Sequence, residues 1–345
     1  MAASMKDVAR LAGVSIKTVS NVVNDYPFVS ADTRSRVRAA LDTLNYRPNT
    51  SARGLRTGRT DLIALAIPAL DEPYFAELAG LIVEAAERRG WTVLIDQTGG
   101  DRAREKLAAG GSRAHRIDGS IASPLALTGE DVADLVRQRP MVLLGERFGH
   151  ITADHVAVDN VQAAREVTRH LIELGRRRIA FVGAQARGRT GAVRLSGYRS
   201  ALLEAGRRPD QALVMPAAPY RRAEGAAAMA RLLATGQPPD AVFCANDLLA
   251  VGAVRTLLSS GLRVPEDVAV VGFDDIEEAR FASPSLSSIS PDKREIAEVS
   301  VDLLCRRIRQ GSTGPPVDVV AGHRLRVRES SVGATGTAVT SGPPE

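Results

Sequence analysis

The residues near the N-terminus that can do chemistry are mostly short hydrogen-bond donors on one continuous segment. They are Ser15, Ile16, Lys17, Thr18, Ser20, Asn21 and Asn24. If this segment forms a helix that begins near Ser15, its free backbone N–H groups and its dipole attract phosphate. Ile16 and Lys17 then point toward base edges, and the hydroxyl and amide side chains suit bases or phosphate. This set of residues is typical of a surface that binds DNA.

The apolar residues around this segment predict three short helices between Met5 and Tyr46. They form three groups at helical spacing: Val8, Leu11 and Ala12; Val19, Val22 and Val23; and Val37, Ala40, Leu41 and Leu44. Gly13 suits the left-handed end of the first helix, and the hydroxyls of Ser15 and Ser30 can cap the next two. Two helices about a glycine turn indicate a helix-turn-helix, which lays its second helix in the major groove. An ordinary helical hairpin gives the same pattern.

Basic residues are concentrated at the same end of the chain. The first 60 residues contain ten Lys and Arg against four Asp and Glu, whereas the whole chain of 345 residues carries a net charge of +5. The remainder is therefore close to neutral. A basic unit joined to a neutral one is expected where only one end meets a polyphosphate, although a solvated basic surface has the same composition.

Beyond Asp61 the sequence alternates between apolar strand-like runs and amphipathic helices. The expected strands are 62–67, 92–95, 119–123, 141–144, 155–158, 178–182, 241–244 and 268–271, and the expected helices include 75–89, 161–174, 194–205, 225–234 and 248–259. This alternation predicts α/β architecture, with parallel sheets covered on both faces. The number of strands indicates two doubly wound lobes. Residues 333–345 lack periodicity and are expected to form a disordered tail.

Several polar and aromatic residues directly follow the expected strands. In parallel sheets ligands bind beyond the carboxyl ends of the strands, so these residues are candidates for binding a small molecule. They are Tyr74 and Phe75 after the first strand, Asn246 and Asp247 after 241–244, and Asp274 and Asp275 after 268–271. Asp and Asn can bind neighbouring hydroxyls of a sugar, and an aromatic ring can cover its C–H face. Such residues also cap helices, which is the favoured role for Asp247.

Other functional classes find little support in the sequence. It has no Gly-x-Gly-x-x-Gly after the first strand, no phosphate-binding loop and no Gly-x-Ser-x-Gly, so we expect no catalytic residues and no cofactor. Cys244, Cys305 and five dispersed histidines lack metal-ligand spacing, so no metal site is expected. With no run of about 18 apolar residues and no signal-like segment, we expect no membrane contact and a cytoplasmic location.

Motifs along nearly the whole chain resemble those of the LacI-GalR family of bacterial transcriptional regulators. They lie at 5–24, 29–34, 44–49, 52–55, 60–64, 244–247 and 271–275. The resemblance implies a helix-turn-helix headpiece at 1–49, a hinge helix and linker at 50–60, and two α/β lobes similar to periplasmic sugar-binding proteins, joined by three crossovers. The first lobe would comprise 61–158 and 291–317, the second 159–290 and 318–331, and the tail 332–345.

The resemblance also implies partners. Members of this family are homodimers, or higher oligomers, that bind pseudo-palindromic double-stranded operator DNA. The expected function is a repressor of sugar uptake or catabolism genes whose effector, a sugar or sugar derivative, acts as inducer or corepressor. Dimerisation is expected through 76–88 and 293–309. A sugar or nucleoside solute-binding protein shares this core and is the alternative, whereas a nucleotide-dependent enzyme requires the missing phosphate motif.

Further DNA-contacting residues are implied by the resemblance. They are Lys6, Tyr46, Asn49, Ala52, Arg53, Leu55 and Arg56. Residues 50–58 would form a hinge helix that orders on operator DNA, with Leu55 as a wedge in the minor groove and Arg53 and Arg56 beside it. Gly54 disfavours the isolated hinge helix by about 1 kcal/mol relative to alanine. An incidental linker leucine is the other interpretation of Leu55.

The resemblance adds effector-binding residues to those found at the strand ends. Thr190, Arg194, Tyr220 and Phe281 match positions around the family's ligand pocket. A cation in the first turn of a helix is electrostatically unfavourable, and an anionic or hydroxyl-rich partner would explain Arg194. Where many relatives carry an acid after the fourth strand, this chain has Gly145, Glu146 and Arg147, so Glu146 is the candidate there. Residues 102–115 depart from the regular amphipathic helix that is usual in the family.

Overall fold

The structure, a computed structural model, describes residues 3–23, 25–46, 59–111, 116–146, 153–185, 190–311 and 314–333. The chain divides between Thr60 and Asp61 into two compact units, which we describe separately as the headpiece and the core. The hinge segment 50–58, most of the expected tail and the candidate DNA contacts Asn24, Asn49, Ala52, Arg53, Leu55 and Arg56 lie outside the described residues.

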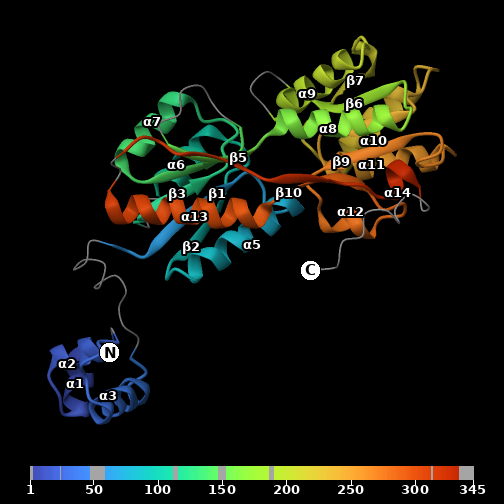
Figure 1. The fold of residues 1–345 in the computed structure, drawn as a ribbon. Helices are drawn as coiled ribbons and strands as arrows, with labels where there is room; N and C mark the ends of the chain where they lie inside the picture. The colour runs from blue at the N-terminus through green and yellow to red at the C-terminus, as the bar shows by residue number, and fades with distance from the viewer. Residues whose placement is uncertain are drawn as a thin grey trace. The chain divides into compact units, whose positions relative to one another are not determined.

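The headpiece consists of three helices, as the apolar spacing predicted (Figure 1). They are α1 (Met5–Ala12), α2 (Ile16–Val23) and α3 (Ala31–Thr43). The helices pack around a small core that includes Val8, Val19 and Val37, each with 0% exposure. Gly13 follows α1 in the left-handed conformation, with φ of 64°, so the chain turns sharply into α2.

The first lobe of the core contains a six-stranded parallel sheet in the order β11-β5-β4-β3-β1-β2. Its strands are β1 (Leu62–Ile67), β2 (Thr92–Gln97), β3 (Gly119–Ala122), β4 (Met141–Leu144), β5 (Asp154–Val158) and β11 (Asp318–Ala321). Its helices are α5 (Pro73–Glu87), α6 (Arg102–Gly110), α7 (Gly129–Gln138) and α13 (Lys293–Gln310). Helices α5 and α13 pack together on one face, and α6 and α7 cover the other (Figure 1).

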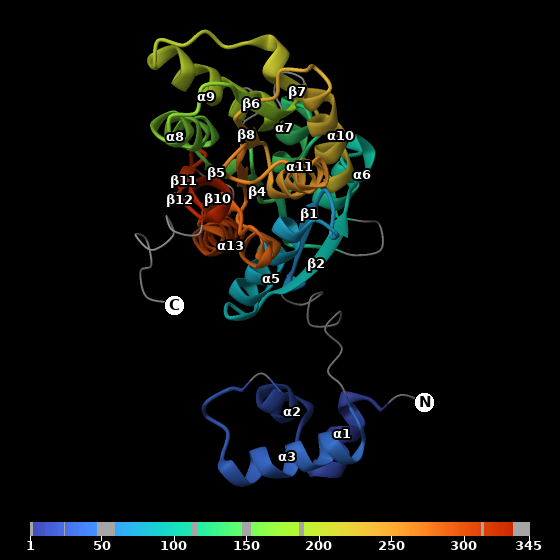
Figure 2. The ribbon, with the colours of Figure 1, turned by 90° about the vertical axis from the view of Figure 1, so that its right-hand side faces the viewer.

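The second lobe contains another six-stranded sheet, in the order β12-β10-β9-β8-β6-β7. Its strands are β6 (Ile179–Ala184), β7 (Val214–Pro216), β8 (Ala241–Cys244), β9 (Ala269–Phe273), β10 (Ser287–Pro291) and β12 (His323–Arg326), and only the β10–β12 pair among them is antiparallel. Its helices are α8 (Asn160–Glu173), α9 (Thr190–Glu204), α10 (Arg222–Leu233), α11 (Asp247–Ser259), α12 (Glu277–Phe281) and α14 (Glu329–Val332), with a 3₁₀ turn at Gln211–Leu213. Figure 2 shows α8 and α9 on one side of this sheet and α10 and α11 on the other.

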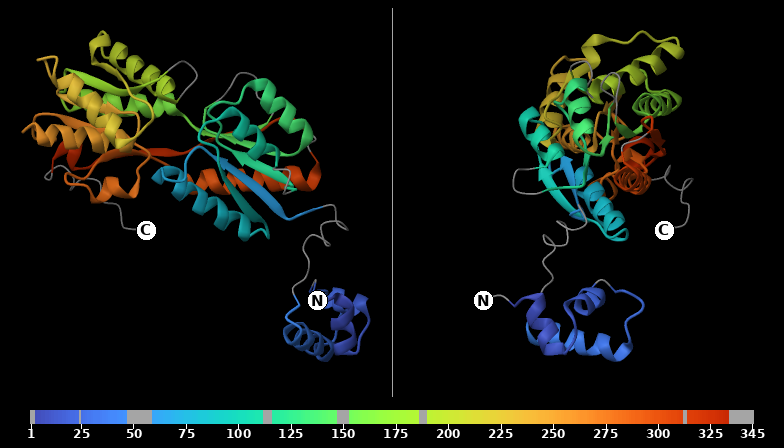
Figure 3. Two further views of the ribbon diagram at one scale, coloured as in Figure 1. Left: turned by 180° about the vertical axis from the view of Figure 1, so that it is seen from behind. Right: turned by 90° about the vertical axis from the view of Figure 1, so that its left-hand side faces the viewer.

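The chain crosses between the two lobes three times, which agrees with the expected architecture (Figure 3). The crossings follow β5, β10 and β11. The expected boundary at residue 318 is wrong, because residues 318–321 form β11 and pair with β5 in the first lobe, not in the second. The chain leaves the first sheet only at Gly322, so the third crossing falls a few residues later than expected.

The expected irregularity of residues 102–115 is also wrong for its described part. Helix α6 runs regularly to Gly110, with the Asp101 carboxylate capping it by accepting the N–H of Arg104 at 2.9 Å. Arg102 and Lys106 pair with the buried carboxylate of Asp131, so two basic residues of this segment have a structural partner. Residues 112–115 lie outside the described residues.

Strand β10 was not predicted because its sequence is rich in serine rather than apolar residues. Ser287 and Ser288 are nevertheless buried, and their hydroxyls are hydrogen-bonded. Ser288 donates to the carboxylate of Asp247 at 2.7 Å, and Ser287 shares a bond of 2.7 Å with Ser331. In the described part of the chain, no helix has the length and apolar character needed to span a membrane.

Close packing of α10 against α11 leaves no room for a side chain at Gly252. A Cβ atom there would overlap the carbonyl oxygen of Arg222 and approach the backbone nitrogen of Ala226 to 2.8 Å. We therefore expect Gly252→Ala to lower the free energy of unfolding by at least about 2 kcal/mol. Gly80→Ala is the control, because a Cβ on this α5 residue meets nothing within 4 Å. Urea denaturation that finds equal stability for both variants would contradict this packing.

Candidate functional site

The N-terminal end of α2 is held in place by a side-chain cap. Ser15 Oγ accepts the backbone N–H of Thr18 at 3.1 Å, as the sequence predicted for this position. The helix buries Val19 and Val22 in the headpiece core and leaves Lys17 exposed and Ile16 46% exposed. The two residues expected to read bases are thus free of the headpiece core, on the first turn of the helix.

The remaining described candidates for DNA contact differ in their surroundings. Lys6 is exposed on α1, and Thr18, Ser20 and Asn21 are half-buried along α2. Tyr46 packs against the headpiece core.

Two headpiece arginines that contribute to the basic charge also maintain the fold. Arg36 donates to the carbonyl oxygens of Ala12 and Gly13, at 2.7 and 3.2 Å, and so binds the C-terminal end of α1. Arg34 pairs with Asp25 at 3.1 Å. Part of the positive charge of this unit therefore has structural partners within the headpiece.

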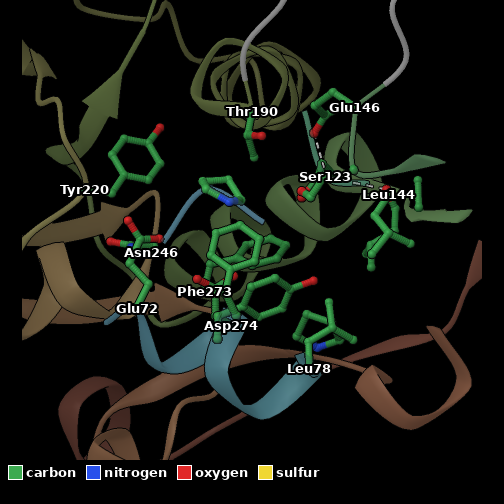
Figure 4. A pocket seen from close by; sticks show the side chains of 18 of the residues that line it. Glu72, Leu78, Ser123, Leu144, Glu146, Thr190, Tyr220, Asn246, Phe273 and Asp274 are labelled. Carbon is green, nitrogen blue, oxygen red and sulfur yellow. Dashed lines mark hydrogen bonds between the residues drawn. The ribbon is translucent and has the colours of Figure 1, made fainter. Parts of the chain in front are cut away.

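A pocket of about 240 Å³ lies between the two lobes of the core (Figure 4). Eight predicted effector residues line it: Tyr74, Phe75, Glu146, Thr190, Arg194, Tyr220, Asn246 and Asp274. Figure 4 shows Glu72, Asn246 and Tyr220 on one side of the pocket and Glu146 and Ser123 on the other. Phe281 was predicted wrongly: it ends α12 with 81% exposure and does not line the pocket.

The guanidinium of Arg194 is the most highly connected group in the pocket. It is only 7% exposed, and it lies in the second turn of α9, not in the first turn as expected, because the helix begins at Thr190. It donates to Asn160 Oδ1 at 2.8 Å and to the carbonyl oxygen of Ala245, and its Cζ lies 3.3 Å from the ring centroid of Phe273. Asp274 lies 3.6 Å away as its counter-ion. These partners compensate the cost of burying the cation and fix its direction.

The strand ends deliver Asn246 and Asp274 to the pocket, as expected for parallel sheets. Asn246 is also the N-cap of α11, where its Oδ1 accepts the N–H of Leu249 at 2.9 Å. Asp274 follows β9 with φ of 104°, a strained backbone conformation for a residue with a side chain. Such strain is typical of functional sites.

The predicted role of Asp247 as a cap is wrong, because Asn246 occupies the cap position. Asp247 is instead fully buried. Its carboxylate accepts the hydroxyl of Ser288 at 2.7 Å and the N–H of Ile276 at 3.0 Å. It therefore ties the start of α11 to β10, the strand from which the second crossing leaves.

The lining residues that the prediction missed include Glu72, Asn160, Gln185 and Phe273. Two of them follow the rule that found the others, since Asn160 comes just after β5 and Gln185 just after β6. Phe273 closes β9 as a fully buried aromatic residue, which gave no polar signal. Glu72 lies directly before α5, beside the two aromatic residues that were identified.

Burial and mutual repulsion disturb the titration of the carboxylates in the pocket. Burial raises the pKa of Glu72 to about 7, and the nearby carboxylate of Asp274 adds to this rise. Burial also raises the pKa of Asp274 to about 6, although Arg194 and Lys293 oppose the shift. The pKa of Glu146 is raised by burial as well. The described residues include no cluster of three or more side chains suited to hold a metal ion.

Arg221 and Lys293 are among the residues that join the lobes next to the pocket. Asp71 of the first lobe pairs with Arg221 of the second at 2.8 Å. Lys293, at the start of α13, pairs with Glu77 and donates to the carbonyl oxygens of Asp274 and Asp275, at 3.1 and 3.2 Å. The position of Asp274, which lines the pocket, is thereby linked to both α5 and α13.

Family models match both parts of the chain. The model described as bacterial regulatory proteins, lacI family, matches residues 4–49, and the model described as periplasmic binding protein-like domain matches residues 168–331. These matches cover the headpiece and most of the second lobe.

Individual relatives extend the similarity to nearly the full chain. The HTH-type transcriptional regulator CelR of Thermobifida fusca is 37% identical over 337 residues, which cover 95% of this chain and 98% of that protein. A solved complex of the transcriptional regulator CelR with cellobiose is 34% identical, with a TM-score of 0.70, and covers 95% of this chain and 100% of that one. The lac repressor dimer bound to operator and the anti-inducer ONPF is 28% identical, with a TM-score of 0.85 over 96% of this chain and 99% of that one. On this evidence the chain belongs to the lacI family of bacterial regulatory proteins and is a DNA-binding transcriptional regulator.

Proposed function

We propose that this regulator binds a pseudo-palindromic operator as a homodimer and changes its operator affinity when an uncharged sugar occupies the pocket. The observation that carries the proposal is the convergence of Arg194, Asn246 and Asp274 in one interlobe pocket of a chain that also has a helix-turn-helix headpiece. We assign the protein no catalytic role, since these residues suit binding and orientation.

The charge of the pocket supports an uncharged effector. Among the described lining residues, Glu72, Glu146 and Asp274 are acidic and Arg194 alone is cationic. Because Arg194 already faces Asp274, a phosphate group would meet an excess of carboxylates. Sugar hydroxyls can donate to carboxylates and accept from the guanidinium, and aromatic rings such as Tyr74 and Phe75 offer apolar faces to sugar C–H groups. The relative CelR has been solved with cellobiose.

The first lobe supports a dimer. Helices α5 and α13 pack side by side, and Ile95 on the edge strand β2 is 40% exposed. Two headpieces on one dimer would read two half-sites related by two-fold symmetry. We extend the DNA contacts to the hinge residues Arg53, Leu55 and Arg56, which lie outside the described residues.

Selection of bound fragments from random duplex DNA tests the operator hypothesis. We expect the intact chain to return a two-fold-symmetric consensus. Lys17→Ala should change the preferred bases, because an exposed cation on the first turn of α2 is positioned to contact base edges. Lys106→Ala, which removes a lysine of the core that pairs with Asp131, should leave the consensus unchanged. A consensus without symmetry would refute the proposed operator.

A thermal-shift panel of glucose, ribose, cellobiose and glucose 6-phosphate tests the effector class. We expect an uncharged sugar to raise the melting temperature and the phosphate ester to have no effect. Arg194→Lys keeps the charge but loses the planar fork, so its sugar affinity should fall at least about tenfold. Arg165→Lys, on an exposed ion pair with Glu204, is the matched control. A shift produced only by glucose 6-phosphate would overturn the proposed class.

The raised pKa of Asp274 predicts a pH-dependent stability. A carboxyl whose pKa is about 6 in the folded protein and near 4 when unfolded contributes stability that is lost as the pH rises through 6. Asp274→Asn should therefore reduce the loss of stability between pH 4 and pH 7.5 by about 1–2 kcal/mol relative to the wild-type chain. Asp267→Asn should have the opposite sign, because Arg263 lowers the pKa of Asp267 to about 2. Urea denaturation at both pH values measures the effects, and an Asp274→Asn variant whose stability falls with pH as steeply as that of the wild-type chain would contradict the electrostatic account.

A further inference from the structure

Asn160 uses both ends of its side-chain amide to join charged residues of the two lobes. It lies just after the first crossing and is 7% exposed. Its Nδ2 donates to Glu146 Oε1 at 2.7 Å, and its Oδ1 accepts from Arg194 Nε at 2.8 Å. Glu146 follows β4 in the first lobe, and Arg194 lies on α9 in the second.

This arrangement requires an amide. A carboxylate has only acceptors to offer, so it can bind Arg194 but cannot donate to Glu146. An ammonium or guanidinium has only donors, so it can bind Glu146 but not Arg194. The two charged neighbours also fix the orientation of the amide, with nitrogen toward the acid and oxygen toward the cation.

The side chain of Asn160 is not needed to start helix α8. Asp159 is the N-cap of that helix, and its carboxylate accepts the N–H of Gln162 at 2.9 Å. Asn160 occupies the next position, where its side chain is directed to Glu146 and Arg194 instead of the helix backbone. The local fold adds only a long bond of 3.5 Å from Asn160 Nδ2 to the carbonyl oxygen of Val158, which does not explain why the amide oxygen faces Arg194.

We propose that Asn160 is a positioning residue of the effector site, which holds Glu146 and Arg194 in fixed relation across the two lobes. Effector affinity then depends on Asn160 through the direction in which it holds the two charged groups. This inference rests on the proposed function of the pocket. It assigns the first crossing a part in recognition, because a change in the angle between the lobes would separate Glu146 from Arg194.

A reversal of donor and acceptor tests the proposal. Asn160→Asp places a second carboxylate against Glu146, and we expect the full chain to bind cellobiose about tenfold more weakly, the effect of losing one hydrogen bond to a charged group. Adding Glu146→Gln restores the pair with its direction reversed, because the new amide donates to the new carboxylate and the pair keeps its total charge. Titration calorimetry should find that the double variant recovers the affinity of Glu146→Gln alone.

The matched control makes the same chemical change on the same helix but away from Arg194. Gln162 donates to Glu166 at 3.2 Å, so Gln162→Glu also places a carboxylate against a carboxylate. We expect it to leave cellobiose affinity unchanged. Equal losses in Gln162→Glu and Asn160→Asp, or no recovery in the double variant, would overturn the positioning role and leave a purely structural residue.

Thermal unfolding without sugar separates this inference from the proposed function. The proteins compared are the wild-type chain, Asn160→Asp, Glu146→Gln and the double variant. Asn160→Asp should lower the melting temperature by about 2–4 °C, and Glu146→Gln in the same chain should restore it. If the wild-type chain binds none of the panel sugars, the proposed effector class is refuted, while the melting cycle still decides whether Asn160 joins the two lobes. Independent, additive effects in that cycle would overturn the inference.

Discussion

The buried guanidinium of Arg194 imposes the constraint on which the rest of the core depends. Burying a cation to 7% exposure costs free energy unless hydrogen-bond acceptors and a counter-ion surround it. The partners of Arg194 come from three separate places in the fold. Asn160 comes from the first crossing, Ala245 from the end of β8, and Phe273 with Asp274 from the end of β9. The sheet register and the first crossing must therefore be correct before the pocket can exist.

The same constraint explains how a small molecule can act on the whole core. Asp274 is linked through its backbone to Lys293, and Lys293 pairs with Glu77, so one pocket residue is connected to both α5 and α13. Asn160 provides a second connection, from Arg194 to Glu146 of the first lobe. An effector that changes the angle between the lobes must strain or break these bonds. The bonds therefore differ between the two conformations, and coupling between two sites requires such a difference.

The sequence predicted those features that have a local chemical signal. The three headpiece helices follow from apolar spacing with Gly13 and Ser15 at their ends, and Asn246 and Asp274 follow from polar residues at strand ends. Features that depend on tertiary partners were missed. Two serines of β10 can be buried because their hydroxyls have partners: Ser288 donates to Asp247, and Ser287 is hydrogen-bonded to Ser331. Phe281 suited the pocket by alignment alone, whereas α12 turns it to solvent.

The central claim is that the pocket and the headpiece are thermodynamically coupled. The most direct test measures operator affinity by fluorescence anisotropy, with and without a saturating amount of the sugar that raises the melting temperature most, and measures sugar affinity with and without operator. The account predicts that both affinities change by one common factor, about 5- to 150-fold, because coupling between two sites is reciprocal. Sugar binding that leaves operator affinity unchanged would contradict it.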